Sequence, residues 1–275
     1  MLLGVYLKNK ALSADPGFLK MKSKLEGAGA VMYEIDSNDN LQDGTDAVLS
    51  VGGDGTFLSA SQLVADSGVP ILGVNLGRLG FLSENRPQDV ANALLDGGYE
   101  LENRTMLSVS ASGGELRPDG EYWPFALNEI AVHRDGAAML GVKVTLDGNA
   151  LPAYWADGLL VATSSGSTAY SLSVGGPICT PDSKVLIIAP IAPHNLNVRP
   201  LVVPETSRIG ISIISRDESA VLTLDNRTMR IDGSVELHVS MAQFSLKRIR
   251  LRNSNFVKAL MSKLFWGEDI RNYSD

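Results

Sequence analysis

The residues best suited to chemistry in this sequence form one short loop, residues 52–56, with the sequence Gly-Gly-Asp-Gly-Thr. The apolar run 46–51 leads into the loop, and a helix-compatible segment follows it. Glycines let the backbone come close to phosphate oxygens, and the N-terminus of a helix adds free N–H donors and a favourable dipole. The loop contains no lysine, so it is not a Walker A loop. The order of strand, glycine loop and helix therefore predicts a phosphate-binding turn.

Asp54 is the residue that would give this turn a reaction. A carboxylate beside bound phosphates is repelled unless it binds a metal ion or takes a proton from an attacking hydroxyl. Either use points to phosphoryl transfer onto an alcohol. The alternative is a structural turn, because aspartate is also a frequent turn residue and helix cap.

A second candidate pair, Asn128 and Glu129, interrupts the apolar strand predicted over residues 126–133. Two adjacent polar residues break the alternation of a strand, so at least one of them faces a direction that should be apolar. A buried amide or carboxylate is costly unless it is paired, and a ribose diol could pair with both. The alternative interpretation is a kink or an edge position in the strand.

The third candidate is the segment that begins at Asp157 and continues through an apolar strand, 159–163, into a loop rich in hydroxyl side chains. Tyr170 closes this loop with a ring that could stack on a base. Such a loop can cap a helix and form hydrogen bonds with a polar heterocycle without adding charge. A solvated connection is the alternative, since Ser/Thr-rich loops often have no other role.

The elements that must position these residues change in character near residue 100. Strand and helix alternate before it, which predicts a parallel sheet with helices on its faces and places the loop 52–56 beyond the carboxyl end of a strand. Strands are predicted over 2–7, 31–35, 46–51 and 70–74, and helices over 16–28, 56–65 and 87–95.

Strand-length, β-rich runs separated by turn signals follow. The predicted fold class is α/β plus all-β: a parallel α/β domain over 1–100, a β-rich, sandwich-like domain over 101–252, and a helical tail over 253–275 that packs back on the first domain. The predicted strands are 106–110, 126–133, 141–146, 159–163, 185–189, 208–215, 220–224, 229–231, 236–240 and 246–251, and the tail helix is 254–265.

Composition narrows the class of partner. The chain of 275 residues is 44% hydrophobic and 20% charged, a balance typical of soluble globular proteins. Its net charge of −7 argues against a nucleic-acid partner, which favours a basic footprint. The single Cys179 cannot form an intramolecular disulfide, and no apolar run reaches the roughly 18 residues of a membrane span. We expect a cytoplasmic protein with neither nucleic acid nor membrane as partner.

Taken together, these motifs resemble those of the NAD kinases, which use ATP or polyphosphate to phosphorylate NAD to NADP. The loop 52–56 is shared with diacylglycerol and sphingosine kinases and, more loosely, with phosphofructokinases, so it indicates only a kinase superfamily. The later motifs are more specific. The resemblance is carried by residues 52–56, 73–82, 127–129 and 157–177, and by 190–194 together with 199–202.

The resemblance implies a role for each matching residue. Asp54 would be the catalytic base that activates the 2′-hydroxyl of the adenosine ribose, or would orient that hydroxyl beside Mg²⁺. The phosphates would be approached by Gly52, Gly53, Gly55 and Thr56. NAD would be bound by Asp54, Gly55, Asn128, Glu129, Asp157, Ser165, Thr168, Ala169, Tyr170 and Ser173.

The family also implies ATP, another nucleoside triphosphate or polyphosphate as donor, Mg²⁺ or Mn²⁺ held mainly by the donor's phosphates, and a homodimer or homotetramer. Two positions depart from its pattern. Ser164 stands where the family usually has proline, and Asp225-Asn226 stands where many members have Asp-Gly. The alternative functions are a lipid kinase that shares the glycine loop and a module that senses NAD(P) without turnover.

Overall fold

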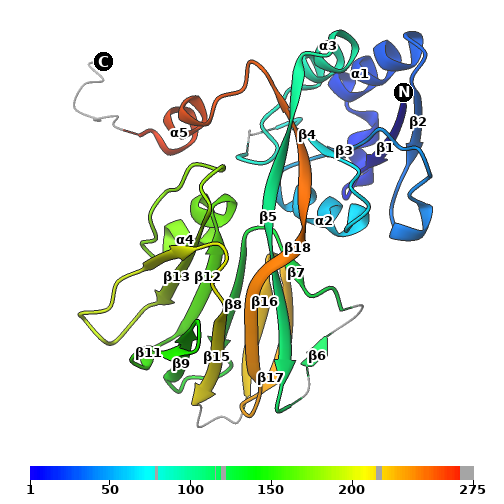
Figure 1. Ribbon diagram of the computed structural model, residues 1–275. Coiled ribbons are helices and arrows are strands. Elements are labelled where there is room, and N and C mark those ends of the chain that lie inside the picture. The colour runs from blue at the N-terminus through cyan, green and yellow to red at the C-terminus, as the bar shows by residue number, and fades with distance from the viewer. Residues whose placement is uncertain (78–79, 115, 119–121, 215–218, 267–275) are drawn as a thin grey trace. The chain divides into compact units, whose positions relative to one another are not determined.

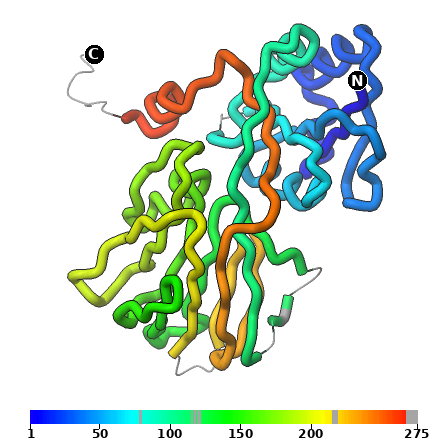
Figure 2. The backbone as a smooth tube through the Cα atoms, in the orientation of Figure 1, coloured from blue at the N-terminus to red at the C-terminus, as the bar shows by residue number. Residues whose placement is uncertain are grey.

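The computed structural model describes residues 1–275 except 78–79, 115, 119–121, 215–218 and 267–275. The chain divides into two compact units, one made of residues 1–103 and 246–275 and the other of residues 104–245. The chain passes between the units within two long strands, β5 (Tyr99–Ser112) and β18 (Glu236–Leu251). Figure 2 shows the chain leaving β18 and continuing into the last helix, α5 (Phe256–Leu264).

The first unit is built on a parallel sheet in the order β4-β3-β1-β2, which the end of β18 joins beside β4 through the Arg248–Ile71 pair. Strand β3 is buried along its whole length, as expected for a parallel strand covered on both faces. Figure 1 shows α1 and α3 on one face of this sheet and α2 on the other. The elements are β1 (Leu2–Tyr6), η1 (Lys10–Ala14), α1 (Pro16–Gly27), β2 (Val31–Glu34), η2 (Asn38–Asn40), β3 (Ala47–Val51), α2 (Asp54–Val64), β4 (Ile71–Val74) and α3 (Pro87–Asp96).

Local signals account for the helix ends of this unit. The Asp15 side chain accepts hydrogen bonds from the N–H groups of Gly17 and Phe18, and Pro16 occupies the first turn of α1. Helix α3 ends at Asp96 and is capped by Gly97, which adopts a left-handed conformation with φ of 64°. The core between this sheet and α1 and α3 contains Phe18, Met21, Leu25, Leu49, Leu72 and Val90.

The second unit contains two sheets. One is antiparallel in the order β14-β13-β12-β8-β16-β17-β6, and the other includes β9, β10, β11, β15, β5, β7 and the first part of β18. The elements are β6 (Leu116–Pro118), β7 (Phe125–Ala126), β8 (Glu129–Arg134), β9 (Leu140–Leu146), β10 (Asn149–Ala150), β11 (Tyr154–Ala156), β12 (Gly158–Thr163), η3 (Ser165–Thr168), α4 (Tyr170–Ser173), β13 (Val185–Ile191), β14 (Leu201–Pro204), β15 (Ile209–Ile214), β16 (Ser219–Leu224) and β17 (Arg227–Asp232).

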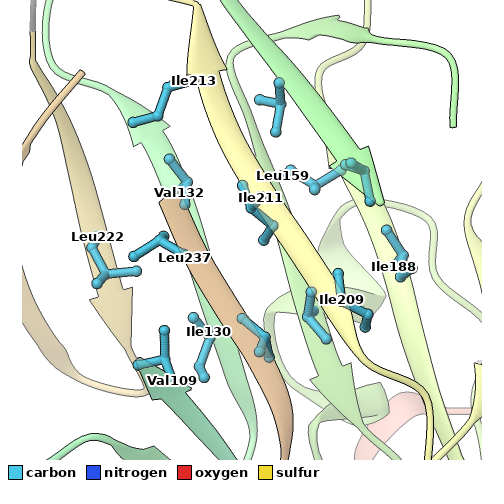
Figure 3. Packing of buried hydrophobic residues seen from close by; sticks show 14 of the residues in the cluster. Val109, Ile130, Val132, Leu159, Ile188, Ile209, Ile211, Ile213, Leu222 and Leu237 are labelled. Atoms are coloured by element: carbon cyan, nitrogen blue, oxygen red, sulfur yellow. The ribbon is translucent and has the colours of Figure 1, made fainter. Parts of the chain in front are cut away.

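Aliphatic side chains from both sheets form the core of this unit. Figure 3 shows them meeting from facing strands, with Ile209 and Ile211 of β15 beside residues of β8, β12 and β13. This packing is what fixes β8 and β12 as a rigid support for the loops at their ends. The labelled members are Val109, Ile130, Val132, Leu159, Ile188, Ile209, Ile211, Ile213, Leu222 and Leu237.

The predicted fold class is confirmed, but several predicted elements were wrong in detail. The strand predicted over 126–133 is broken at residues 127–128, where the backbone bends between β7 and β8. The strands predicted over 236–240 and 246–251 are one strand, β18, whose burial alternation slips by one residue near Met241. The strand predicted over 106–110 is the middle of the longer β5. Strands β6, β10, β11 and β14 were not predicted.

Candidate functional site

The glycine loop lies where the sequence places it, between the carboxyl end of β3 and the N-terminus of α2. The N–H of Gly52 donates to the Val74 carbonyl of β4 at 2.9 Å, so the loop starts in register with the sheet. A side chain at Gly52 would come within 2.4 Å of the Thr56 hydroxyl, and its φ of 149° also favours glycine. Gly53 and Gly55 are exposed, with open space where a Cβ would stand. Gly53 and Gly55 therefore form the open face of the loop, whereas Gly52 is buried and Thr56 is partly buried.

Asp54, the first residue of α2, has its carboxylate tied to a second loop of the same unit. Its Oδ2 accepts the Phe81 N–H at 2.8 Å, and its Oδ1 accepts the N–H groups of Leu82 and Ser83 at 3.0 and 2.8 Å. A carboxylate offers about four acceptor positions, two on each oxygen. Within the described part of the chain, these three bonds leave one position, on Oδ2. That oxygen is where a hydroxyl proton can be received.

The loop that holds Asp54 is a tight turn, residues 80–83, closed by the Gly80 N–H donating to the Ser83 carbonyl at 2.9 Å. A Cβ at Gly80 would lie 1.9 Å from Asp54 Oδ1, so only glycine fits there. The Asn75 amide donates to the Ser83 carbonyl at 3.1 Å, and the Asn85 amide donates to the Gly73 carbonyl at 3.0 Å. The turn is therefore anchored to β4 as well as to Asp54.

In the second unit, Asn128 and Glu129 lie at the bend that begins β8 and are buried, with 7% and 8% of their surface exposed. Among the described residues, Asn128 Oδ1 and Glu129 Oε2 have no hydrogen-bond partner. A buried acceptor without a donor is costly, so both oxygens are suited to donors brought by a ligand. The pKa of Glu129 is raised to about 8, first by burial and then by the charge of Asp225, while the backbone N–H of Tyr170 opposes the shift.

Asp225 holds this bend in place. Its Oδ2 accepts the Leu127 N–H at 2.8 Å, and its Oδ1 accepts the N–H groups of Asn128 and Glu129 at 2.8 and 3.1 Å. Asp225 sits at the turn between β16 and β17 with a left-handed φ of 53°, which aspartate tolerates. The strand predicted through Asn128 and Glu129 breaks because these N–H groups bind a carboxylate and not a neighbouring strand.

The loop rich in hydroxyl groups packs against the same bend. The Thr163 hydroxyl donates to the Leu127 carbonyl at 2.6 Å, and a Cβ at Gly166 would come within 2.1 Å of the Asn128 carbonyl oxygen. The Tyr170 ring stacks on His133 with ring centroids 5.8 Å apart. The hydroxyl loop therefore reaches Asn128 and Glu129 directly.

The other predicted residues of this loop have local roles in the structure. Ser165 is buried at the start of η3, where its hydroxyl accepts from Arg104 at 3.4 Å, and the Thr168 hydroxyl donates to the Ser165 carbonyl at 3.4 Å. Ala169 caps the short helix α4, and Ser173 is exposed at its end. Ser164, in the position where the family usually has proline, donates to the Pro181 carbonyl at 3.1 Å.

Asp157 lies between β11 and β12 and forms an ion pair with Arg134, with Oδ1 2.8 Å from Nε. Both side chains are partly exposed, so this pair is screened by solvent. The charge of Asp157 also reaches Tyr170, whose pKa is raised first by burial and then by Glu129 and Asp157. Asp157 thus belongs to the electrostatic surroundings of the hydroxyl loop.

The chain is similar in sequence to a set of known kinases. Residues 11–97 match the family described as ATP-NAD kinase N-terminal domain, and residues 127–251 match ATP-NAD kinase C-terminal domain. The NAD kinase of Flavobacterium psychrophilum is 43% identical over 244 residues, which cover 87% of this chain and 82% of that protein. The chain belongs to the NAD kinase family.

Solved structures agree with this membership of the NAD kinase family. An NAD kinase from Archaeoglobus fulgidus, in complex with ATP, superposes with a TM-score of 0.76 at 28% identity and covers 96% of this chain and 98% of its own. Yeast NADH kinase, complexed with NADH, superposes with a TM-score of 0.84 over 100% of this chain and 90% of its own. At 22% identity, the yeast enzyme supports the fold alone.

Sequence reasoning did not find two site residues of this NAD kinase family member. In the sequence, Asp225 stands out only as a departure from the family pattern, and Gly80 only as part of a motif. The roles of both depend on contacts with distant parts of the chain, which the sequence does not reveal. The one available signal was an aspartate beside asparagine between two β-rich runs, which predicts a hairpin turn with left-handed residues. It does not predict where the carboxylate points.

The raised pKa of Glu129 predicts a pH dependence of stability in this NAD kinase family member. Because the folded-state pKa, about 8, lies above the ordinary 4.5, the folded protein holds a proton that the unfolded chain has lost at intermediate pH. Stability should therefore fall as pH rises from about 4.5 to about 8. Glu129→Gln should remove an effect on the order of a few kcal/mol across that window. Melting temperatures measured from pH 5 to 8.5 test this, and parallel curves for the two proteins would contradict it.

Proposed function

We propose that this protein transfers the γ-phosphoryl group of ATP to the 2′-hydroxyl of the adenosine ribose of NAD, giving NADP and ADP. The observation that carries the proposal is the Asp54 carboxylate, held at the N-terminus of α2 with one acceptor position left on Oδ2. Besides holding the turn 80–83, a carboxylate at that place would repel bound phosphates unless it binds a metal ion or receives a proton from an attacking hydroxyl.

In this mechanism the backbone of residues 52–56 binds the donor's phosphates through the open face of the loop and the first N–H groups of α2. The ribose 2′-hydroxyl donates its proton to Asp54 Oδ2 while its oxygen forms a bond to the γ-phosphorus. The bond between that phosphorus and the bridging oxygen of ADP breaks in the same step. Asp54 later releases the proton to solvent. Positioning and charge neutralisation, not covalent chemistry, provide most of the rate.

NAD would be held by the second unit. Asn128 Oδ1 and Glu129 Oε2 are buried acceptors suited to ribose hydroxyls or to the amino group of adenine. Tyr170 would present its ring to a base. The family's pattern assigns the remaining contacts to Asp157, Ser165, Thr168, Ala169 and Ser173.

A divalent cation, Mg²⁺ or Mn²⁺, would bind mainly through the donor's phosphates. No group of three or more His, Cys, Asp or Glu side chains that could hold a metal occurs among the described residues. In many kinases Mg²⁺ is held by one or two carboxylates together with the phosphates of the substrate, and a cation would bind in the same way in this protein. When bound, the cation neutralises charge on the phosphates. Asp54 would contribute a carboxylate beside those phosphates, because it is the first residue of α2.

Family membership also supports ATP as the donor, which the Archaeoglobus fulgidus protein binds in its crystal structure. On the same ground we propose that other nucleoside triphosphates and polyphosphate can serve as donors. We also propose that the protein is a homodimer or homotetramer and is located in the cytoplasm. None of the described helices has the length and apolar character needed to cross a membrane.

The test is NADP formation by the purified protein with NAD, ATP and Mg²⁺, read out by an NADP-specific dehydrogenase. Wild-type protein should form NADP, and omission of ATP or metal should abolish it. If no NADP forms from NAD with ATP or polyphosphate, and no NADPH forms from NADH, the proposal is wrong. Calorimetry with NAD would then distinguish a sensing module, which binds it, from a lipid kinase, which does not.

A further inference from the structure

The C-terminal helix α5 places two side chains on the turn that holds Asp54. Phe256 and Lys263 are seven residues apart, which is about two helical turns, so they project from one face of α5. The Phe256 ring lies 6.3 Å from the Phe81 ring, and the Lys263 ammonium lies 4.7 Å from the same ring. Lys263 Nζ also donates a hydrogen bond to the Gly80 carbonyl oxygen.

The peptide group that accepts a hydrogen bond from Lys263 also donates one to Asp54. The Gly80 carbonyl and the Phe81 N–H belong to a single planar peptide unit. Lys263 donates to the oxygen of that peptide unit, and the N–H of the same unit donates to Asp54 Oδ2 at 2.8 Å. A hydrogen bond to the carbonyl of an amide also polarises its N–H and makes it a stronger donor. Lys263 thus acts on the carboxylate oxygen that has an acceptor position left.

Lys263 is partly buried and lies among other charged side chains. Burial lowers its pKa first, the charges of Glu84 and Asp54 raise it, and Arg248 lowers it. Arg248 binds the other side of the turn, donating to the Leu82 carbonyl at 3.3 Å and pairing with Glu84. Two cations therefore hold the carbonyls of the turn whose N–H groups hold Asp54.

We propose that Lys263 is a positioning residue of the transfer site: it fixes the Gly80–Phe81 peptide so that Asp54 Oδ2 faces the acceptor hydroxyl. The inference rests on the proposed function. A static anchor for α5 would need only the contact between Phe256 and Phe81. Lys263 adds a charge-assisted bond to the peptide that aims Asp54.

The test compares Lys263→Met and Lys263→Arg with Lys258→Met, an exposed lysine on the same helix that serves as the matched control. Methionine keeps the length and apolar stem of lysine but cannot donate. Lys263→Met should lower kcat for NADP formation by about 10-fold and change KM for NAD by less than about twofold, as expected when positioning is lost without binding. Lys263→Arg should restore most of kcat, and Lys258→Met should match wild type.

A double variant shows whether Lys263 acts through Asp54. In an Asp54→Asn background, the 10-fold effect of Lys263→Met should shrink to less than about twofold, because residues that act as one unit are not additive. An unchanged kcat in Lys263→Met, or a full 10-fold effect in the Asp54→Asn background, would overturn the proposal.

A second readout does not depend on activity. The amides of residues 81–83 should exchange hydrogen for deuterium about 10-fold faster in Lys263→Met than in wild type or Lys258→Met. Equal exchange in all three proteins would refute the role of Lys263 in holding this turn. Failure of wild type to form NADP, with faster exchange in Lys263→Met, would instead reject the proposed function and retain the contact.

Discussion

Asp54→Asn should lower kcat for NADP formation by about 100-fold or more and leave NAD affinity within about twofold, by the usual size of general-base effects. The amide cannot accept the proton of the ribose hydroxyl. It also replaces one acceptor oxygen by a donor, which then faces an N–H of Phe81, Leu82 or Ser83. Steady-state kinetics and calorimetry with NAD measure the two quantities separately.

The matched control for this variant is Asp66→Asn, an exposed aspartate just beyond the other end of α2. It should keep kcat within about twofold of wild type, because surface substitutions of this kind have small effects. Near-normal kcat in Asp54→Asn would contradict the proposed base. If Asp54→Asn regained its kcat at a lower temperature at which the variant also refolds, the loss would come from unfolding. Asp54 would then have a structural role only.

Gly80→Ala provides an independent approach to the same carboxylate. Its methyl group would stand 1.9 Å from Asp54 Oδ1, so the carboxylate must move although its chemistry is intact. The variant should therefore lose kcat with Asp54 still present. Full activity would show that the position of Asp54 in the turn does not matter for the reaction.

The first unit was predictable from sequence because its signals are local. The buried run of β3 reads directly as an apolar segment, and Asp15, Pro16 and Gly97 mark helix ends by their own chemistry. The glycine loop was equally predictable, since strand, glycines and helix follow one another in the chain. Helix α2 begins at Asp54, two residues before the predicted start, because Gly53 serves as its N-cap.

The site was only partly predictable because the groups that hold it come from distant segments. Asp54 is 27 to 29 residues from the N–H groups it accepts, Asp225 is 96 to 98 residues from its own, and Lys263 is 183 residues from Gly80. Periodicity and spacing carry no information on such pairs. Both aspartates nevertheless use one arrangement, a carboxylate that accepts three consecutive backbone N–H groups.

Asp225→Asn should destabilise the protein by about 2 to 4 kcal/mol and abolish measurable NAD binding. The amide offers one acceptor oxygen where three N–H groups, from residues 127–129, need acceptors, and its NH₂ group opposes at least one of them. The bend at Asn128 and Glu129 should relax toward a regular strand. The two buried acceptors would then lose the positions proposed for ribose recognition. Urea denaturation and calorimetry with NAD measure both effects.

Asp147→Asn is the matched control, because Asp147 also occupies a hairpin turn with a left-handed φ, 50° against 53° for Asp225. Within the described part of the chain, its Oδ1 accepts one N–H, from Arg208 at 2.8 Å, and asparagine can keep that bond. This variant should lose less than about 1 kcal/mol and bind NAD normally. Equal destabilisation by the two substitutions would attribute the effect to turn conformation. Greater loss in Asp225→Asn, together with lost NAD binding, would attribute it to the three N–H groups that fix Asn128 and Glu129.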